Sequence, residues 1–325
     1  MNEDWVNFLK SNNAFPAEDP INNKTVGHQT ITALQHLAIL KVTGADAATF
    51  LQGQLTCNIN ELTEQKACFT AFCNAKGRAI STLLIFKTST GFLIILPQAL
   101  ISKVSQKLQM YIMRSAVKLE DVSNELCIMG VNTQQPDTLT SPLTEPFSIY
   151  QDKGIYIKFP YHNRYLVIST PLQAIALWSD LTTKQAFIAS TESSWVEQDI
   201  SAGIPWLTQE SSEGYIPQML NIDKLGGISF NKGCYTGQEI IARTHYLGKT
   251  KRELFLAYCD ETNDITIDTP IMTDISEQIA GNILSLHSNG QQTKLLIVLR
   301  STDLEAKNLI LNNLNKDKLY LTDFQ

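Results

Sequence analysis

The stretch NKGCYTGQE, residues 231–239, places Cys234 between two glycines, with Lys232 before it and Glu239 after it. Glycine relieves the steric limits on the backbone, so the stretch suits a tight loop that a ligand or another strand can approach closely. The next residues, GQEIIAR, have the pattern of the first turn of a helix, with Glu239 near the positive end of the helix dipole. We therefore predict a loop that ends at a helix, with Cys234 just before it.

Three interpretations of Cys234 are open from this pattern. A helix N-terminus and the ammonium of Lys232 both favour a thiolate, which would make the cysteine reactive. A small buried residue at a tight turn explains the same letters, because most free cysteines are structural. In a third interpretation the backbone N–H groups of the loop form an anion-binding nest, strengthened by the start of the helix.

Length and composition indicate the general class of protein. The chain has 325 residues, 43% hydrophobic and 18% charged, which is typical of a globular protein of two or three domains. A net charge of −6 argues against a generally basic nucleic-acid-binding surface. There is no apolar run of signal-peptide or membrane-span length, so we expect a cytosolic protein that does not enter the membrane. The six cysteines form no CxxC, so we expect reduced thiols and no metal site.

Positive charge gathers after the quoted stretch, at Lys232, Arg243, Lys249, Lys251 and Arg252, against the single acid Glu239. Such a cluster is a solvated face, an interdomain ion-pair network, or a patch that receives an anionic tail such as a polyglutamate or a phosphate.

The order of the predicted elements indicates an α+β protein. Residues 29–43 end in a strand, and Asp46 is placed to cap a short helix. Residues 67–96 are predicted to form consecutive strands with turns at NAKGR and TSTG, followed by a helix with Leu100, Val104, Leu108 and Ile112 on one face.

A second cycle of strands and helices spans residues 154–207. From about residue 251 the pattern changes to short strands, which predicts a small all-β domain such as a barrel.

Longer segments bring in a resemblance. The segment GGISFNKGCYTGQEIIART resembles the signature of the YgfZ-type proteins, which are relatives of the glycine-cleavage T-protein, an aminomethyltransferase. The segments VTGADAATFLQGQLTCNI, FCNAKGRA, SSWVEQDISAGIP and GYIPQMLNIDKLGGISF are similar to further segments of that family, in the same order, from about Leu37 to Arg252. YgfZ-type proteins bind folate and serve iron–sulfur cluster assembly or repair.

The resemblance implies a ring of three domains around a central folate-binding cavity: two α+β domains and a C-terminal β-barrel. We expect a discontinuous folate-binding domain of residues 1–50 and 150–245, a second α+β domain of residues 51–149, and a barrel of residues 246–325.

The resemblance also transfers site residues. The family's folate-stacking tryptophan falls on Trp195, and its other folate-contacting tryptophan falls on Leu37. At two positions where relatives carry acids, this chain has Asn58 and Ser201. Asp199, two residues before Ser201, would compensate for the missing acid only if the local backbone turned its side chain into the folate site. Lys232 and Arg243 are expected to attract the glutamate tail, and Cys234 and Lys232 are the candidate catalytic residues. The expected cofactor-binding residues are Trp195, Leu37, Lys232, Gly233, Tyr235, Gly237, Gln238, Glu239 and Arg243.

We thus expect a protein that binds tetrahydrofolate or a derivative and supports iron–sulfur cluster assembly or repair. Through iron–sulfur enzymes it would support tRNA modification, with iron–sulfur client proteins or assembly factors as partners and no direct contact with nucleic acid. Two alternatives stay open: an aminomethyltransferase of the T-protein type, and a scaffold in which Cys234 is inert.

Overall fold

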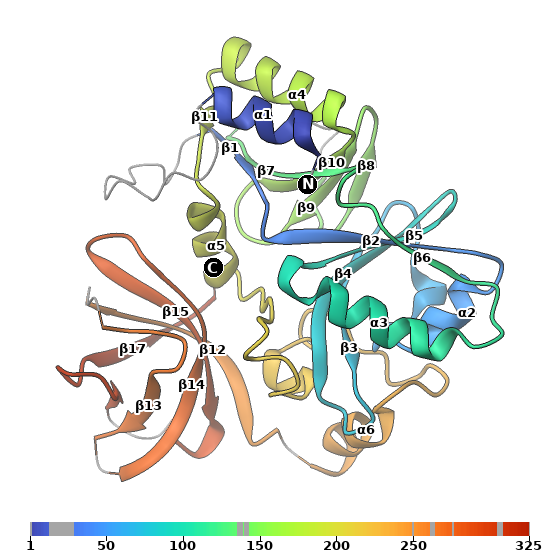
Figure 1. Cartoon of the computed structure of the whole chain (residues 1–325). Coiled ribbons are helices and arrows are strands. Elements are labelled where there is room, and N and C mark those ends of the chain that lie inside the picture. The colour runs from blue at the N-terminus through green and yellow to red at the C-terminus, as the bar shows by residue number, and fades with distance from the viewer. Residues whose placement is uncertain are drawn as a thin grey trace.

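A computed structural model describes residues 2–12, 29–134, 139, 143–248, 250–260, 264–274, 276–303 and 308–324. Figure 1 shows three lobes, each built on its own sheet, arranged around helix α5 (Glu192–Ser201). Two lobes combine strands with helices and the third is all-β, so the predicted α+β class with a C-terminal barrel is confirmed.

The first lobe contains a five-stranded antiparallel sheet in the order β3-β4-β5-β2-β6. Its strands are β2 (Leu37–Thr43), β3 (Cys68–Cys73), β4 (Ala79–Thr88), β5 (Gly91–Pro97) and β6 (Lys118–Asp121). The turns predicted at NAKGR and TSTG join β3 to β4 and β4 to β5. Two helices, α2 (Ala47–Gln52) and α3 (Ile101–Ile112), belong to this lobe.

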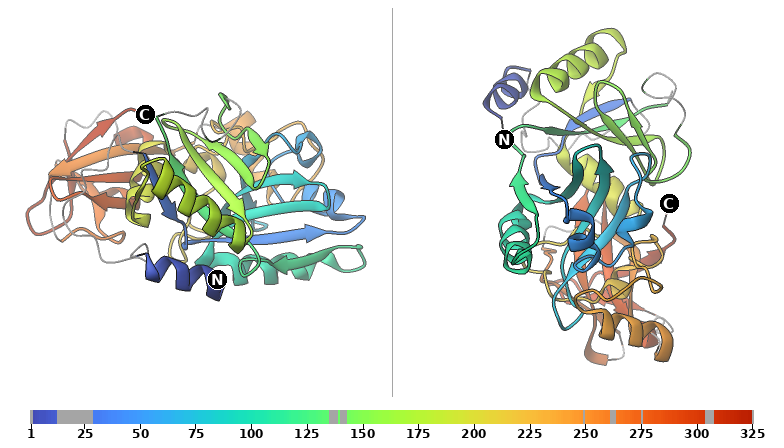
Figure 2. Two further views of the ribbon diagram at one scale, coloured as in Figure 1. Left: turned by 90° about the horizontal axis from the view of Figure 1, so that it is seen from above. Right: turned by 90° about the vertical axis from the view of Figure 1, so that its right-hand side faces the viewer.

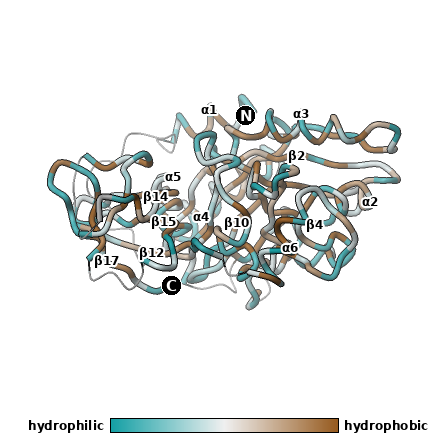
Figure 3. The backbone as a smooth tube through the Cα atoms, turned by 90° about the horizontal axis from the view of Figure 1, so that it is seen from below, coloured by the Kyte–Doolittle hydropathy of each residue, from teal (hydrophilic) through white to brown (hydrophobic). Residues whose placement is uncertain are grey.

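The helices of this lobe follow the sequence pattern with one difference. Helix α3 buries Val104, Leu108 and Ile112 as predicted, and Figure 3 shows hydrophobic and hydrophilic residues alternating along it. Asp46 precedes α2 but does not cap it. Its carboxylate instead accepts a hydrogen bond from the backbone N–H of Ala116, 2.7 Å away, because the chain that leads into β6 passes there.

The second lobe contains a six-stranded sheet in the order β11-β1-β7-β10-β9-β8. Its strands are β1 (Thr30–Ala33), β7 (Cys127–Asn132), β8 (Ile149–Gln151), β9 (Ile155–Phe159), β10 (Arg164–Ser169) and β11 (Ile188–Ala189). Helices α1 (Glu3–Ser11) and α4 (Pro171–Lys184) cover one face, where the Trp5 and Trp178 rings meet edge to face.

Strand β7 shows how α5 is placed on the opposite face of this sheet. Side chains alternate along a strand, so Met129 and Val131 join the core under α1 and α4, while Ile128 joins the core on the other side. Gly130 lies between them and lets the Trp195 ring of α5 rest directly on the strand.

The third lobe is a closed barrel in the order β12-β15-β14-β13-β16-β17. Its strands are β12 (Arg252–Asp260), β13 (Pro270–Thr273), β14 (Ser276–Ser288), β15 (Gln292–Arg300), β16 (Leu309–Leu311) and β17 (Lys318–Thr322). Pairing of β12 with β17 closes the barrel, so none of these six described strands is a free edge. Short 3-10 turns lie at Ile59–Glu61, Gln98–Leu100, Pro217–Leu220 and Ser301–Asp303.

Helix α6 (Gln238–Leu247) follows the signature loop, as predicted. Figures 1 and 2 place it at the end of the molecule opposite to α1 and α4.

The sheets do not follow the predicted domain bounds. β2 pairs with β5 and β6, although residues 1–50 were assigned to the other domain, and β7 pairs with β1 and β10. Residues 13–28 of the predicted first domain lie outside the described residues. The domain bounds stay a prediction, since pairing alone does not define a domain.

Candidate functional site

A cavity of about 740 Å³ lies where the three lobes meet. Helix α5 supplies one wall, the start of the segment after β5 supplies another, and the barrel supplies the third. The size lies within the 300–1,000 Å³ typical of small-molecule sites. Its lining is mostly apolar and is formed by Gln35, His36, Pro97, Gln98, Ala99, Val196, Asp199, Ile200, Ile204, Trp206, Leu207, Thr208, Ile265, Thr266, Ile267, Leu284, Ser285 and Leu286.

Asp199 is the buried carboxylate of this wall. It is 2% exposed, and its Oδ1 lies 2.7 Å from Arg164 Nη1 in an ion pair. The indole N–H of Trp206 donates to Oδ2 at 3.0 Å. Burial raises the pKa of Asp199, and the Arg164 charge opposes that rise. The carboxylate is therefore fixed in orientation, and each oxygen keeps a lone pair for a further donor.

His36 and Glu192 tie the start of α5 to the chain just before β2. The backbone N–H of His36 donates to Glu192 Oε1 at 2.6 Å, and the imidazole Nδ1 contacts the same oxygen. Burial raises the pKa of Glu192, but the hydrogen bonds and charge of His36 outweigh burial and lower it overall. His36 also lines the cavity, so its imidazole is a second polar group on the cavity wall, after Asp199.

Trp195 lies behind the cavity wall. The ring is 1% exposed, and the Arg164 guanidinium carbon lies 4.8 Å from its centroid. A Cβ at Gly130 would overlap the ring. Trp195 does not line the 740 Å³ cavity. Its stacking on folate therefore stays a prediction, and it would require a movement that exposes the buried ring to the cavity.

Trp206 is the tryptophan that does line the cavity. Trp195 and Trp206 lie on either side of the SAGIP segment, but only Trp195 was predicted to contact folate. Val196, Asp199 and Ile200 are spaced i, i+3 and i+4, so they share the face of α5 that lines the cavity. Trp195 lies four residues before Asp199, so helical spacing does not separate it from that face; the packing of its ring on Gly130 of the sheet does.

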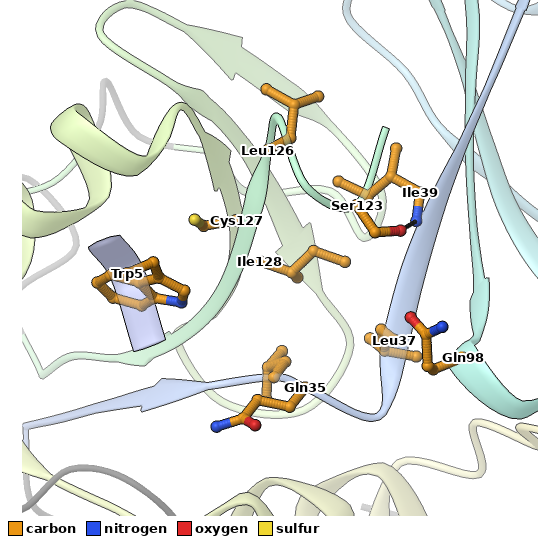
Figure 4. A pocket seen from close by; sticks show the side chains of 10 residues that line it. Trp5, Gln35, Leu37, Ile39, Gln98, Ser123, Leu126, Cys127 and Ile128 are labelled. Atoms are coloured by element: carbon orange, nitrogen blue, oxygen red, sulfur yellow. Dashed lines mark hydrogen bonds between the residues drawn. The ribbon is translucent and has the colours of Figure 1, made fainter. Parts of the chain in front are cut away.

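Leu37 lies apart from the large cavity. It is 4% exposed and borders a separate space of about 30 Å³, with Trp5 and Ile128 among its neighbours (Figure 4). That volume has room for about one water molecule, not for a pterin. The preceding residue, His36, lines the large cavity instead.

The two positions without an acid have local partners. Asn58 Oδ1 accepts a hydrogen bond from Gln52 Nε2 at 2.9 Å and caps the following 3-10 turn. Ser201 is 1% exposed, and its hydroxyl lies 3.3 Å from Lys294 Nζ of the barrel. Lys294 also pairs with Glu197 at 3.0 Å, so this part of α5 is fastened to β15.

The signature loop packs on the five-stranded lobe. Lys232 Nζ donates to the carbonyls of Leu55 and Cys57, both at 2.8 Å, and lies 4.9 Å from the centroid of the Tyr235 ring. Burial lowers the pKa of Lys232 to about 8, and Cys57 opposes that shift. Burial also raises the pKa of the Tyr235 hydroxyl.

Gly237 joins the loop to the NAKGR turn. Its φ is +84°, and a Cβ there would lie 2.6 Å from Asn74 O and 2.8 Å from Gly77 Cα. Next to it, the N–H of Thr236 donates to Gly53 O at 3.2 Å. The structure therefore brings together three of the segments that carried the resemblance: QGQLT, NAKGR and the signature.

The remaining signature residues are more open. Cys234, Gly233, Glu239 and Arg243 are exposed, and Gln238 Oε1 accepts the N–H of Tyr235 at 3.3 Å. None of the signature residues, which are all described, lines the 740 Å³ cavity. Lys249 of the predicted basic cluster lies outside the described residues.

The described residues show neither a metal-ligand cluster nor a membrane-spanning helix. They contain no group of three or more His, Cys, Asp or Glu side chains arranged to hold a metal ion. In the same residues, no helix has both the length and the apolar character needed to span a membrane.

Comparison with known proteins shows the structural class to which this fold belongs. Residues 15–162 match the GCVT N-terminal domain family. The structure superposes on the glycine cleavage system aminomethyltransferase T from Bartonella henselae with a TM-score of 0.72, over 97% of this chain and 88% of that one, at 12% identity. The chain thus has the aminomethyltransferase T fold.

Sequence similarity then gives the family. The chain is 31% identical over 262 residues to the tRNA-modifying protein YgfZ of Colwellia psychrerythraea, covering 78% of this chain and 79% of that protein. It is 32% identical over 247 residues to the protein of the same name from Yersinia pseudotuberculosis, covering 74% of each. The chain belongs to the YgfZ family of tRNA-modifying proteins.

Proposed function

We propose that this protein binds a tetrahydrofolate in the 740 Å³ cavity. In that state it would support iron–sulfur cluster assembly or repair and, through iron–sulfur enzymes, tRNA modification. Its membership of a family named for tRNA modification supports the second part. The pairing of Asp199 with Trp206 on one cavity wall carries the first part.

The chemistry of this wall fits a pterin. A carboxylate accepts paired hydrogen bonds from adjacent N–H groups, and the pterin ring presents such donors. An indole offers a flat surface for stacking on a planar heterocycle. Asp199 would hold the ring N–H groups, Trp206 would pack on the ring, and His36 would supply a further polar contact. Folate, when bound, supplies a carrier for one-carbon groups.

The residues of this wall act by orientation and exclusion of water. Arg164 and Trp206 hold the two oxygens of Asp199, so little side-chain entropy is lost on binding. Ile200, Ile204 and other apolar lining residues exclude water, which strengthens each hydrogen bond made inside.

The signature loop would act outside the folate cavity. Lys232 is held by two carbonyls, so it acts first by fixing the loop on the five-stranded lobe. The exposed Cys234 would be the thiol that meets a client protein, and the exposed Arg243 would attract an anionic tail. Rescue of iron–sulfur enzyme activities in a deletion strain by Cys234→Ala would contradict the thiol's chemical part.

Calorimetric titration with tetrahydrofolate tests the site. We expect Trp206→Ala to weaken binding about tenfold, equivalent to about 1.4 kcal/mol, from lost stacking. Asp199→Asn should weaken it by at least as much, because the amide removes the charge and one acceptor. Leu172→Ala, at a side chain that is 79% exposed on α4, is the matched control. Equal affinity of Trp206→Ala and the control would remove the cavity from the proposal.

A second candidate is aminomethyl transfer to tetrahydrofolate, favoured by the superposition on aminomethyltransferase T over nearly the whole chain. Formation of methylene-tetrahydrofolate from an aminomethylated carrier protein would establish it. We rank it second because Asn58 and Ser201 replace acids at two positions of the pattern.

A further inference from the structure

A second cavity, the α4 groove, lies between α4 and the turn that joins β8 to β9. Its volume is about 450 Å³, within the 300–1,000 Å³ typical of small-molecule sites. It shares no lining residue with the 740 Å³ cavity. In Figure 1, α4 and α5 lie on opposite sides of the six-stranded sheet, so the sheet separates the two cavities.

One face of α4 forms a wall of the groove. The α4 residues that line it are three or four positions apart, or adjacent, so they lie on one side of the helix. They are Gln173, Ala176, Leu177, Asp180, Thr183 and Lys184. Ala176, Thr183 and Lys184 are exposed, so the groove opens to solvent. Trp178 and Leu181 pack into the core beneath the helix and fix its position on the sheet.

The sheet forms the floor of the groove. Tyr156 of β9 and Val167 of β10 line it and are 7% and 0% exposed, so an aromatic ring lies beside an aliphatic side chain. At the β8–β9 turn, a Cβ on Gly154 would lie 3.4 Å from Ser169 Cβ. The turn therefore lies close to the end of β10 and bounds the groove on the side away from α4.

Ser169 gives the floor a polar group. It is the last residue of β10, is 5% exposed and lines the groove. Its hydroxyl has no hydrogen-bond partner among the described residues. Buried hydroxyls in folded proteins normally have a partner, because a buried unpaired polar atom costs free energy. A ligand on the floor of the groove would supply this partner.

The charges that line the groove leave one cation available. Asp180 and Lys184 form an ion pair at 2.7 Å, and Gln185 Nε2 donates to the other Asp180 oxygen at 3.1 Å. Lys153, in the β8–β9 turn, forms no ion pair within the part of the chain that the structure describes. The pair cancels its own charge, so Lys153 makes the groove favourable for an anionic group.

These three features specify a ligand. A flat apolar ring fits against Tyr156 and Val167, an anionic group fits beside Lys153, and a polar atom fits beside the Ser169 hydroxyl. We propose that the α4 groove is a second small-molecule site, which binds an aromatic carboxylic acid.

The probe is indole-3-acetate, titrated into the full-length protein and followed by ligand-detected nuclear magnetic resonance. We expect saturable binding with a Kd on the order of 1 mM, as suits a ligand of this size. Indole-3-acetamide has the same shape without the charge and should bind about threefold more weakly. Lys153→Met should remove the difference between the two probes, because it removes the cation that distinguishes them.

Three variants locate the probe. Ala176→Trp fills the groove from an exposed position and should abolish binding. Leu172→Trp places the same side chain on α4 at a residue that is 79% exposed and does not line the groove, so it should bind like the parent. Ser169→Ala should weaken binding about fivefold and leave the urea midpoint unchanged, because the free protein has no hydrogen bond there to lose.

Three outcomes would overturn the inference: no saturable binding up to about 10 mM probe, equal binding by Ala176→Trp and the parent, or loss of binding in Trp206→Ala. The last result would place the acid in the 740 Å³ cavity instead. Circular dichroism of each variant separates loss of binding from loss of the fold. Tetrahydrofolate affinity should be unchanged in Ala176→Trp, so this inference and the proposed function fail independently.

Discussion

The contact between Gly237 and the NAKGR turn gives a sharp test of how the signature loop is held. Gly237 has a φ of +84°, and a Cβ there would lie 2.6 Å from the carbonyl oxygen of Asn74 and 2.8 Å from Gly77 Cα. Both neighbours are backbone atoms, which cannot turn away as a side chain can. Gly237→Ala must therefore separate the loop from the turn or distort both.

The expected cost has two parts. A left-handed conformation costs an L-residue about 1–2 kcal/mol. Overpacking of a close contact costs about 1–3 kcal/mol. The sum is about 2–5 kcal/mol. With an m-value of about 3 kcal/mol/M in urea, the unfolding midpoint should fall by about 1 M.

Gly233 supplies the control within the same loop. A Cβ at Gly233 would meet no heavy atom within 4 Å. Gly233→Ala should therefore leave stability within about 0.5 kcal/mol of the parent, as is usual for an open surface position. Urea unfolding followed by circular dichroism compares the two variants. Equal midpoints for Gly237→Ala and Gly233→Ala would refute the close packing of the loop on the turn.

Three more variants test the buried polar contacts. Burial lowers the pKa of Lys232 to about 8, so between pH 8 and pH 10.5 the unfolded chain holds the proton more tightly than the folded chain does, and stability rises with pH. Relative to Lys232→Met, the parent should gain about 3 kcal/mol over this range in urea unfolding, and an equal pH dependence of the two proteins would contradict the burial of this ammonium. Asp199→Asn leaves the buried guanidinium of Arg164 without its counter-ion and should cost about 3–5 kcal/mol in urea unfolding; a loss below 1 kcal/mol would show that the pair is not buried as described. Trp206→Phe removes one hydrogen bond to Asp199 and should cost about 1.5–3 kcal/mol, an effect that Asp199→Asn should largely abolish in a double-mutant cycle.

Individual helices and turns could be predicted from the sequence because the residues that determine them lie close together in the chain. The apolar spacing of α3, the turns at NAKGR and TSTG and the helix after Gly237 all follow from short-range geometry. The family signature is likewise continuous, so it gave the family, the fold class and the loop without knowledge of any contact.

The residues of the candidate site could not be assigned in the same way, because contacts between distant segments decide which of them face the cavity. Trp195 and Trp206 look equivalent in sequence, but Gly130 and Arg164 from the neighbouring sheet enclose the first, and the second lines the cavity. Lys232 looked like a free cation for an anionic tail, but two backbone carbonyls from another segment hold it.

The sequence by itself determined the elements, the family and the presence of a glycine-shaped loop before a helix. The tertiary structure alone decided which strands share a sheet, that Asp199 turns to the cavity, and that two backbone carbonyls hold Lys232. The physical reason is that helical period and turn chemistry act over a few residues. Burial, ion pairing and hydrogen bonds between segments depend on which distant parts of the chain the fold brings together.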